Sequence, residues 1–259
     1  MEPRASATLG YFSSLIISAI ISSNKIDELQ TLFRVKGLIM IITEKFPGVF
    51  LVDGKLATVN LTPGKRFFDE ALLREGGKEY RLWDPNRSKA GAAIAKGIKL
   101  FPITKDSKIL YLGAAHGFTP TFLSDIVGEN GIIYAVEFSD RCFTDLLPVC
   151  EKRKNIAPIL ADARLPDQYS WIEKVDAVYQ DIAQPDATEI AIRNCRIFLK
   201  KGCYLLLTIK ARSVDVTKNP RKLIEEEIEK LRAAGFVIDD WKMLDPFERD
   251  HGFIVAMMK

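Results

Sequence analysis

The feature that most constrains this fold is an apolar segment that runs directly into a glycine-bracketed turn. Residues 108–117 read KILYLGAAHG, so a predicted strand is followed at once by Gly113 and Gly117. A second apolar run, IIYAVEF, carries Glu137 at its end, 24 residues after Gly113. A strand, a glycine turn, a helix and a second strand that ends on an acid form the nucleotide-binding half of a Rossmann-type sheet. The pattern therefore predicts a parallel α/β sheet with a ligand against this turn.

The residues of the turn bear on the identity of that ligand. The turn reads Gly-Ala-Ala-His-Gly rather than G-x-G-x-x-G, so no pyrophosphate needs to be surrounded by the backbone. Glu137 can accept hydrogen bonds from both hydroxyls of a ribose. This combination favours S-adenosylmethionine over a dinucleotide. The alternative is a parallel-sheet turn with no ligand, because short glycine motifs also occur by chance.

Length and composition set outer limits on the class of protein. A chain of 259 residues suits one large α/β domain, alone or with a small appendage. The 37 basic and 34 acidic residues leave a net charge of +3, which permits a local nucleic-acid-binding patch without requiring one. The four cysteines include no C-x-x-C pair, so we expect reduced packing residues in an intracellular protein and no metal site.

The N-terminal residues 9–23 form an uncharged, mostly apolar run. The run is shorter than the roughly 20 residues that a helix needs to cross a bilayer. A signal peptide or an anchor is the alternative, but no clear small-residue cleavage site follows. We expect an extra N-terminal helix, or a start codon assigned too far upstream, and no membrane association.

Three regions are predicted along the chain: an extension of uncertain status (1–32), a small antiparallel β domain (33–82) and a larger α/β domain (83–259). In the second region, Asp53-Gly54 lies between apolar runs, which predicts a hairpin. Residues 74–89 are expected to link this small domain to the larger one.

Helices and strands alternate regularly from residue 88 onward. The predicted helices are 89–100, 119–127, 140–153, 187–199 and 221–235, and the predicted strands are 109–112, 132–138, 156–160, 175–180, 203–209, 236–244 and 252–258. Such alternation implies a parallel sheet with right-handed crossovers. The last two runs should pair antiparallel. A mostly parallel seven-stranded sheet with a terminal antiparallel hairpin is the usual shape of Rossmann-like class I methyltransferases.

Polar residues follow five of the predicted strands, and ligands bind at the carboxyl ends of strands in an open parallel sheet. These residues are the glycine turn through Thr119, then Glu137, Asp162, Asp181 with Gln184, and Lys210. Any one of them could be an ordinary loop residue. Their coincidence favours one shared site, and its acidic character suits a cofactor with a positive sulfonium.

Individual roles follow from this placement. Asp162 in ILADAR would bind the exocyclic amine of an adenine, with Ala163 against the ring. Glu137 would hold the ribose. Asp181 and Gln184 would lie near the amino acid part of the cofactor and its methyl group.

Two lysines and a histidine are further candidates. Lys210 ends the apolar strand CYLLLTIK, where a buried lysine is costly unless it is paired or functional. The alternative is a solvated lysine that begins a loop. Lys89, at a predicted helix start, is alternatively a surface lysine, and His251 is alternatively a turn residue. Arg212, which follows Lys210, can bind phosphate.

At this point the chain resembles the fibrillarin family. The resemblance covers residues 33–259 and rests on WDPNRSK, YLGAAHGFT, SDIVG, YAVEF, NIAPILADAR, VYQDIAQP, LLLTIKARSVDVT and LDPFERDHGFIVAMM, in that order. It implies an S-adenosylmethionine-dependent 2′-O-methyltransferase that acts on ribosomal and transfer RNA. The absence of a Gly/Arg-rich tail is typical of the archaeal branch and implies a cytoplasmic protein.

The resemblance also implies roles for individual residues. The family's Lys-Asp-Lys-His set maps to Lys89, Asp181, Lys210 and His251. Its cofactor-binding residues map to Gly113, Ala114, Ala115, Gly117, Phe118, Thr119, Glu137, Phe138, Asp162, Ala163, Asp181 and Gln184. RNA contact is expected mainly to phosphates, from Arg87, Lys89 and Arg212.

Four positions depart from the family pattern. His116 stands where a small hydroxyl residue is common, and Phe118 stands where Thr is common. Asp84 and Asn86 replace a more usual Asn and aromatic residue. These departures concern the details of cofactor contact and leave the acids at the strand ends in place.

The resemblance suggests a mechanism. A ribose 2′-hydroxyl is a poor nucleophile until its proton is removed or tightly hydrogen-bonded. Our hypothesis is that Lys210, with its neutral form favoured by burial and by Lys89, orients or deprotonates that hydroxyl. Asp181 would position the lysine, and His251 would support the RNA or the second lysine. Asp181 as the base is the alternative, because a carboxylate favours the charged form of a neighbouring lysine.

The partners are implied by the resemblance alone. They are a box C/D guide RNA, the target RNA, a Nop-type scaffold protein and a kink-turn-binding ribosomal-type protein. One alternative is a stand-alone methyltransferase for a small molecule or a protein, which would turn over without guide RNA. The other is a non-catalytic RNA-binding module, which would bind no cofactor.

Overall fold

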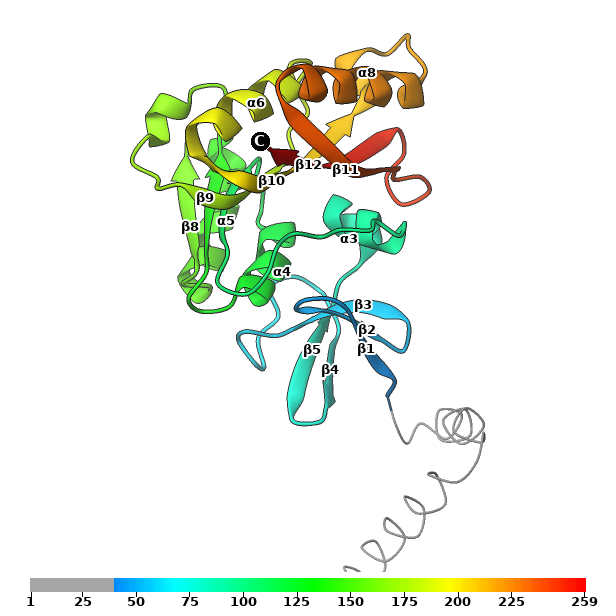
Figure 1. The fold of residues 1–259 in the computed structure, drawn as a ribbon. Coiled ribbons are helices and arrows are strands. Elements are labelled where there is room, and N and C mark those ends of the chain that lie inside the picture. Colours follow the sequence, from blue (N-terminus) through cyan, green and yellow to red (C-terminus); the bar gives the residue numbers. More distant parts are fainter. Residues whose placement is uncertain (1–39) are drawn as a thin grey trace, which may run out of the picture. The chain divides into compact units, whose positions relative to one another are not determined.

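The computed structural model describes residues 40–259, which Figure 1 shows in colour. The chain divides into two compact units, residues 1–42 and 43–259, and the account that follows concerns the second. The predicted extension 1–32, with its apolar run, lies outside the described residues. Within the described part, no helix is both long and apolar enough to cross a membrane.

The smaller of two sheets has five strands and contains the predicted hairpin. Its strands are β1 (Ile42–Phe46), β2 (Val49–Val52), β3 (Lys55–Val59), β4 (Leu72–Glu75) and β5 (Lys78–Leu82), in the order β1-β2-β3-β5-β4. Asp53 and Gly54 both have positive φ, and β2 pairs antiparallel with β3 on either side of them. This is the geometry expected of an Asp-Gly hairpin, so the prediction is confirmed.

Residues 74–89 are not the linker that the sequence suggested. Strands β4 and β5 form a second hairpin around Gly76 and Gly77, which both have positive φ. The alternation that marks a strand was hidden, because the inward positions of β5 include the charged Glu79 and Arg81. These two residues are only 6% and 0% exposed.

The larger sheet has the predicted seven strands. They are β6 (Lys108–Leu112), β7 (Ile132–Glu137), β8 (Ile156–Leu160), β9 (Val175–Gln180), β10 (Leu199–Lys210), β11 (Phe236–Met243) and β12 (His251–Met258). Their order is β11-β12-β10-β9-β6-β7-β8. The pairs from β10 to β8 are parallel, and β12 runs antiparallel to both of its neighbours. The predicted fold class is therefore confirmed.

Helices cover both faces of this sheet. They are η1 (Pro85–Arg87), α3 (Lys89–Ala95), α4 (Phe118–Val127), α5 (Asp140–Lys152), η2 (Pro166–Tyr169), α6 (Ala187–Phe198), α7 (Ala211–Val214) and α8 (Pro220–Ala233). One buried cluster packs residues of α3, α4 and α5 against the sheet, and another packs η2, α6 and α8. Figure 1 shows α6 and α8 together beside β10. Helix α3 ends five residues before the predicted limit, and Gly97 follows with positive φ.

A buried ion-pair network joins the small sheet to α4. The Arg81 guanidinium lies 2.8 Å from Glu70 and 2.7 Å from Asp125, and all three side chains are at most 2% exposed. Arg153 also pairs with Asp125. The Thr58 hydroxyl on β3 donates a 2.7 Å hydrogen bond to the same carboxylate. Charged and polar groups, rather than apolar contacts alone, therefore hold the small sheet against the α/β domain.

Candidate active site

Three residues of the glycine turn adopt the left-handed backbone region that favours glycine. Gly113, Ala115 and Gly117 all have positive φ, at 84°, 47° and 88°. A Cβ atom at Gly113 would lie 2.3 Å from the carbonyl oxygen of Asp181. The first glycine is therefore required by the close approach of the end of β9, where the sequence had suggested only the approach of a ligand.

Glu137, at the end of β7, is held by the turn. Its two carboxylate oxygens accept hydrogen bonds from the backbone N–H groups of Ala115 (2.8 Å) and Ser139 (2.9 Å). The residue is only 6% exposed. Each oxygen keeps a further lone pair, so the carboxylate can still accept hydrogen bonds from a ligand.

A cavity of about 370 Å³ lies at the carboxyl ends of β6, β7, β8 and β9. Eight residues of the predicted cofactor set line it: Gly113, Ala115, Glu137, Phe138, Asp162, Ala163, Asp181 and Gln184. The sequence did not single out the other lining residues, which are Val136, Ser139, Cys142, Ala161, Arg164, Ile182, Ala183 and Ile190. The strand-end argument located the cavity, because parallel strands bring their carboxyl ends to one edge.

Four residues of the predicted cofactor set do not line this cavity. They are Ala114, Gly117, Phe118 and Thr119, which belong to the inner side of the turn and the start of α4. The Thr119 hydroxyl donates a 2.9 Å hydrogen bond to the Ser88 hydroxyl. Phe118 lines a different cavity. Helix α4 begins at Phe118, so side chains from there onward pack into the fold rather than toward the ligand.

Asp162 carries a partner that the sequence reading missed. The Arg164 guanidinium donates hydrogen bonds to both of its carboxylate oxygens, at 2.6–3.1 Å. These hydrogen bonds hold the pKa of Asp162 below its ordinary value. A ligand amine at Asp162 would therefore share the carboxylate with Arg164.

Lys89 is the lysine that pairs with Asp181. Its Nζ lies 3.1 Å from Asp181 Oδ2, and the Thr208 hydroxyl donates a 3.0 Å hydrogen bond to Oδ1. Burial lowers the pKa of Lys89, but attraction to Asp181 and Glu248 outweighs burial, and the pKa lies above its ordinary value. Lys89 is therefore a cation at neutral pH and anchors the carboxylate.

The expectation of a buried Lys210 is wrong. Lys210 is exposed at the end of β10, and no ion pair of Lys210 occurs among residues 40–259. His251 lies opposite it in the antiparallel register with β12. His251 is 8% exposed, begins the strand rather than lying in a turn, and donates from Nδ1 to the carbonyl oxygen of Arg249 at 2.7 Å. The strand end carries Lys210 past the buried part of the sheet.

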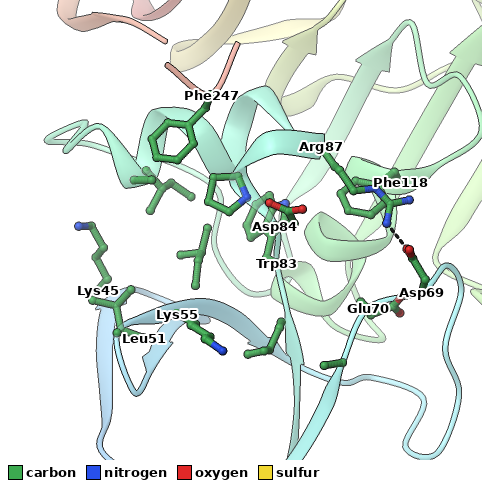
Figure 2. Close-up of a pocket in the computed structure, with 17 residues that line it drawn as sticks. Lys45, Leu51, Lys55, Asp69, Glu70, Trp83, Asp84, Arg87, Phe118 and Phe247 are labelled. Atoms are coloured by element: carbon green, nitrogen blue, oxygen red, sulfur yellow. Dashed lines mark hydrogen bonds and ion pairs between the residues drawn. The ribbon is translucent and has the colours of Figure 1, made fainter. Parts of the chain in front are cut away.

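The predicted RNA-binding arginines already have partners within the chain. Arg87 pairs with Asp69, and its guanidinium lies 4.3 Å from the centre of the Phe118 ring. Figure 2 shows this arrangement at the edge of a cavity of about 660 Å³ between the small sheet and the η1–α3 segment. Arg212 pairs with Asp250 at 3.1 Å. The two arginines therefore belong to ordered surfaces rather than to free loops.

Comparison with known proteins agrees with this architecture. The fibrillarin family model matches residues 40–259. A fibrillarin-like rRNA/tRNA 2′-O-methyltransferase of Methanocaldococcus jannaschii is 47% identical over 222 residues, covering 83% of this chain and 96% of the relative. The solved structure of Aeropyrum pernix fibrillarin with natively bound S-adenosyl-L-methionine is 44% identical, with a TM-score of 0.78, and the match covers 85% and 99% of the two chains.

A solved fibrillarin/Nop5p complex provides a third similar chain. It is 40% identical, with a TM-score of 0.77, and the match covers 84% of this chain and 100% of that one. The family match takes in both sheets and every residue of the cavity. This chain therefore belongs to the fibrillarin family.

Proposed function

We propose that this chain transfers a methyl group from S-adenosylmethionine to ribose 2′-hydroxyls of ribosomal and transfer RNA, at sites that a box C/D guide RNA selects. The observation that carries the proposal is the set of acids, Glu137, Asp162 and Asp181, around a single cavity at the carboxyl edge of the sheet. Asp181, which lines this cavity, also pairs with Lys89. A relative that is 47% identical carries the name of the activity, and a solved structure that is 44% identical contains the cofactor.

The residues present fit the cofactor. Glu137 has free lone pairs for ribose hydroxyls, and Asp162 is an ionised acceptor for the adenine amine. Ala161 and Ala163 supply small apolar walls for a flat ring. The cofactor, when bound, supplies a methyl group on a positive sulfur, and an acidic cavity favours that charge.

The site residues would act on the acceptor hydroxyl. The 2′-oxygen bonds to the methyl carbon, the electrons of the broken C–S bond stay on sulfur, and the hydroxyl proton passes to a base. Lys89 is a poor candidate for that base because its pKa is raised. Asp181 lies in the cavity and is oriented by Lys89 and Thr208, so we assign the proton to Asp181. Lys210 would hold the RNA or its hydroxyl from the exposed side.

Selection of the target is assigned to partners rather than to this chain. The net charge is only +3, which is consistent with weak RNA affinity of the chain alone. Phosphate contacts are proposed from Arg87, Lys210 and Arg212. A relative has been solved as a complex with Nop5p, which supports a Nop-type scaffold here. Guide RNA and a kink-turn-binding protein complete the proposed particle.

Transfer of labelled methyl to a target RNA tests this function. The reaction is run with the complete set of guide RNA, scaffold and kink-turn-binding protein, and with each omitted in turn. Label on the guide-specified 2′-oxygen, only in the complete mixture, is expected. A guide with a shifted pairing register is the matched control, because the labelled nucleotide should shift with it.

Two other outcomes would contradict the proposal. Transfer without guide or partners would indicate a stand-alone enzyme. Binding of no cofactor would indicate a non-catalytic RNA-binding module, and calorimetry with S-adenosylmethionine distinguishes that case from an enzyme that lacks only its partners.

A further inference from the structure

A second group of chemically active side chains lies at the mouth of the cofactor cavity. His116 Nδ1 lies 3.1 Å from Asp145 Oδ2, and His116 Nε2 lies 3.9 Å from Cys142 Sγ. Cys142 lines the cofactor cavity itself. His116 and Asp145 line a separate surface depression beside it. One imidazole therefore bridges a carboxylate on the surface and a thiol on the wall of the cavity.

Two separate elements hold this arrangement. Cys142 and Asp145 are three residues apart on α5, so they lie on one face of the helix. The Ser139 hydroxyl caps α5 and accepts a hydrogen bond from the backbone N–H of Cys142. His116 comes from the glycine turn, between the positive-φ residues Ala115 and Gly117. The position of His116 is thus set by the same turn that holds the acid of β7.

The order carboxylate, imidazole, thiol is the order that activates a nucleophile. His116 Nε2 can accept the thiol proton of Cys142, and Asp145 then stabilises the imidazolium through Nδ1. Cys142 also lies in the first turn of α5, at the positive end of the helix dipole. Thiolate, not thiol, is the reactive form.

The other three cysteines lack this environment. Burial raises the pKa of Cys150 to about 12 and also raises the pKa of Cys195. Burial and the charge of Asp176 raise the pKa of Cys203. No histidine contact is found for these three thiols within residues 40–259. They therefore serve as internal references of low reactivity.

We propose that Cys142, with His116 as its base and Asp145 behind it, is a modification site that reacts with small disulfides and thereby closes the cofactor cavity. The Cys142 thiolate attacks one sulfur of the disulfide, a new S–S bond forms and the old one breaks. The other half leaves as a thiolate and takes up the proton held by His116. The adduct projects from the cavity wall beside Phe138 and Ser139. The effect on cofactor binding rests on the proposed function, whereas the reactivity of the thiol does not.

Reaction of the full chain with oxidised glutathione near neutral pH tests the reactivity. Peptide mass spectrometry should find the adduct on Cys142 before any other cysteine. His116→Asn should slow that reaction about tenfold, because an unassisted thiol is only a few per cent ionised. Asp145→Asn should slow it less. Glu151→Gln, which removes an exposed acid further along α5, is the matched control and should react as the unmodified chain does.

An equal reaction rate in the unmodified chain and in His116→Asn would contradict the proposed activation of Cys142 by His116. So would earlier reaction at Cys203. The side chains of His116 and Asp145 are about half exposed, at 51% and 59%, so both variants are expected to fold.

Calorimetry with S-adenosylmethionine tests the closing of the cavity. The adduct should weaken cofactor binding at least tenfold, and reduction should restore it, whereas a Cys142→Ser chain should show no change on treatment. Unchanged binding by the adduct would overturn the closure while the proposed function stands. Failure of the untreated chain to bind cofactor would refute the proposed function and the closure together. The rate of adduct formation would still test whether His116 activates the thiol of Cys142.

Discussion

At the scale of single residues, the three acids of the cavity differ in the groups that orient their carboxylates. Glu137 accepts hydrogen bonds from backbone N–H groups, and Asp162 accepts hydrogen bonds from the guanidinium of Arg164. Asp181 forms an ion pair with the ammonium of Lys89. Each carboxylate is thus oriented before a cationic ligand binds, which reduces the reorganisation that binding requires.

Glu137→Gln should weaken binding of S-adenosylmethionine about 10- to 100-fold, because hydrogen bonds to a charged group contribute about 1.5–3 kcal/mol. Calorimetry on the isolated chain measures the change. Glu129→Gln, an exposed acid in the α4–β7 turn, is the matched control and should bind normally. Equal affinity of Glu137→Gln and the unmodified chain would remove Glu137 from the proposed site.

Asp181→Asn should lower kcat for methyl transfer by about 10²-fold or more, which is the range for loss of a positioned base. Lys210→Ala should mainly raise the KM for RNA, because Lys210 is exposed and unpaired with Asp181 in the described residues. Single-turnover kinetics in the complete particle separates the two effects. A kcat loss for Lys210→Ala that equals the loss for Asp181→Asn would move the role of base to the lysine.

At the scale of elements, buried ion pairs stabilise strand β5, which the sequence did not predict as a strand. Strand β5 has Glu79 and Arg81 on its inward side, and Arg81 reaches Glu70 and Asp125. Buried ion pairs are costly to break singly, because the remaining partner is left as an uncompensated charge. The small sheet and α4 are therefore expected to unfold together.

Arg81→Leu should lower the free energy of unfolding by about 3–5 kcal/mol, because it leaves Glu70 buried without its cation and leaves Asp125 with Arg153 alone. Urea denaturation, followed by circular dichroism, measures the change. Arg74→Leu is the matched control on β4, since Arg74 pairs with Glu79 but is 76% exposed, and such pairs contribute at most about 1 kcal/mol. Similar losses in the two variants would contradict the network.

Acid should weaken the same network. Burial raises the pKa of Glu70, but Arg81 and the backbone N–H groups of Phe67 and Phe68 outweigh burial, and the pKa lies below 4.5. The unfolded chain then binds the proton more readily, so this stabilisation is complete above pH 4.5 and disappears as pH falls through the folded-state pKa. Urea denaturation across that range should give a steeper acid loss for the unmodified chain than for Glu70→Gln. Parallel curves would exclude Glu70 as the cause.

At the scale of the whole molecule, a residue proposed to bind RNA lies next to the helix that carries a residue of the proposed active site. Arg87 precedes α3, which carries Lys89, and Arg87 borders the large cavity shown in Figure 2. Helix α3 therefore connects the cofactor cavity with the surface proposed for RNA. The net charge of +3 is consistent with the proposal that partner proteins orient the RNA.

Arg87→Gln should reduce the slope of log affinity against log salt by about 0.9 for a guide–target duplex, as expected for one lost phosphate contact. Filter binding of the assembled particle at several salt concentrations measures the slope. Lys78→Gln, at the start of β5 and outside the lining of this cavity, is the matched control. An unchanged slope for Arg87→Gln would place the RNA elsewhere.

Much of this architecture could be predicted from the sequence alone. The glycine turn, the alternation of helices and strands, and the acids at the strand ends depend on local pattern and on the rule that parallel strands end at one edge. Asp162 and Asp181 were found in this way, and both line the cavity. The second hairpin was not found, because its inward side chains are charged.

The sequence by itself determined the succession of helices and strands along the chain, the edge of the sheet that carries the cavity, and the acids that face it. Only the tertiary structure decided that Lys89 rather than Lys210 pairs with Asp181, and that His116 meets Cys142. The physical reason is range. Local patterns specify each element and its ends, whereas these pairs join residues far apart in the chain. Their distances depend on how α3 and α5 pack against the sheet.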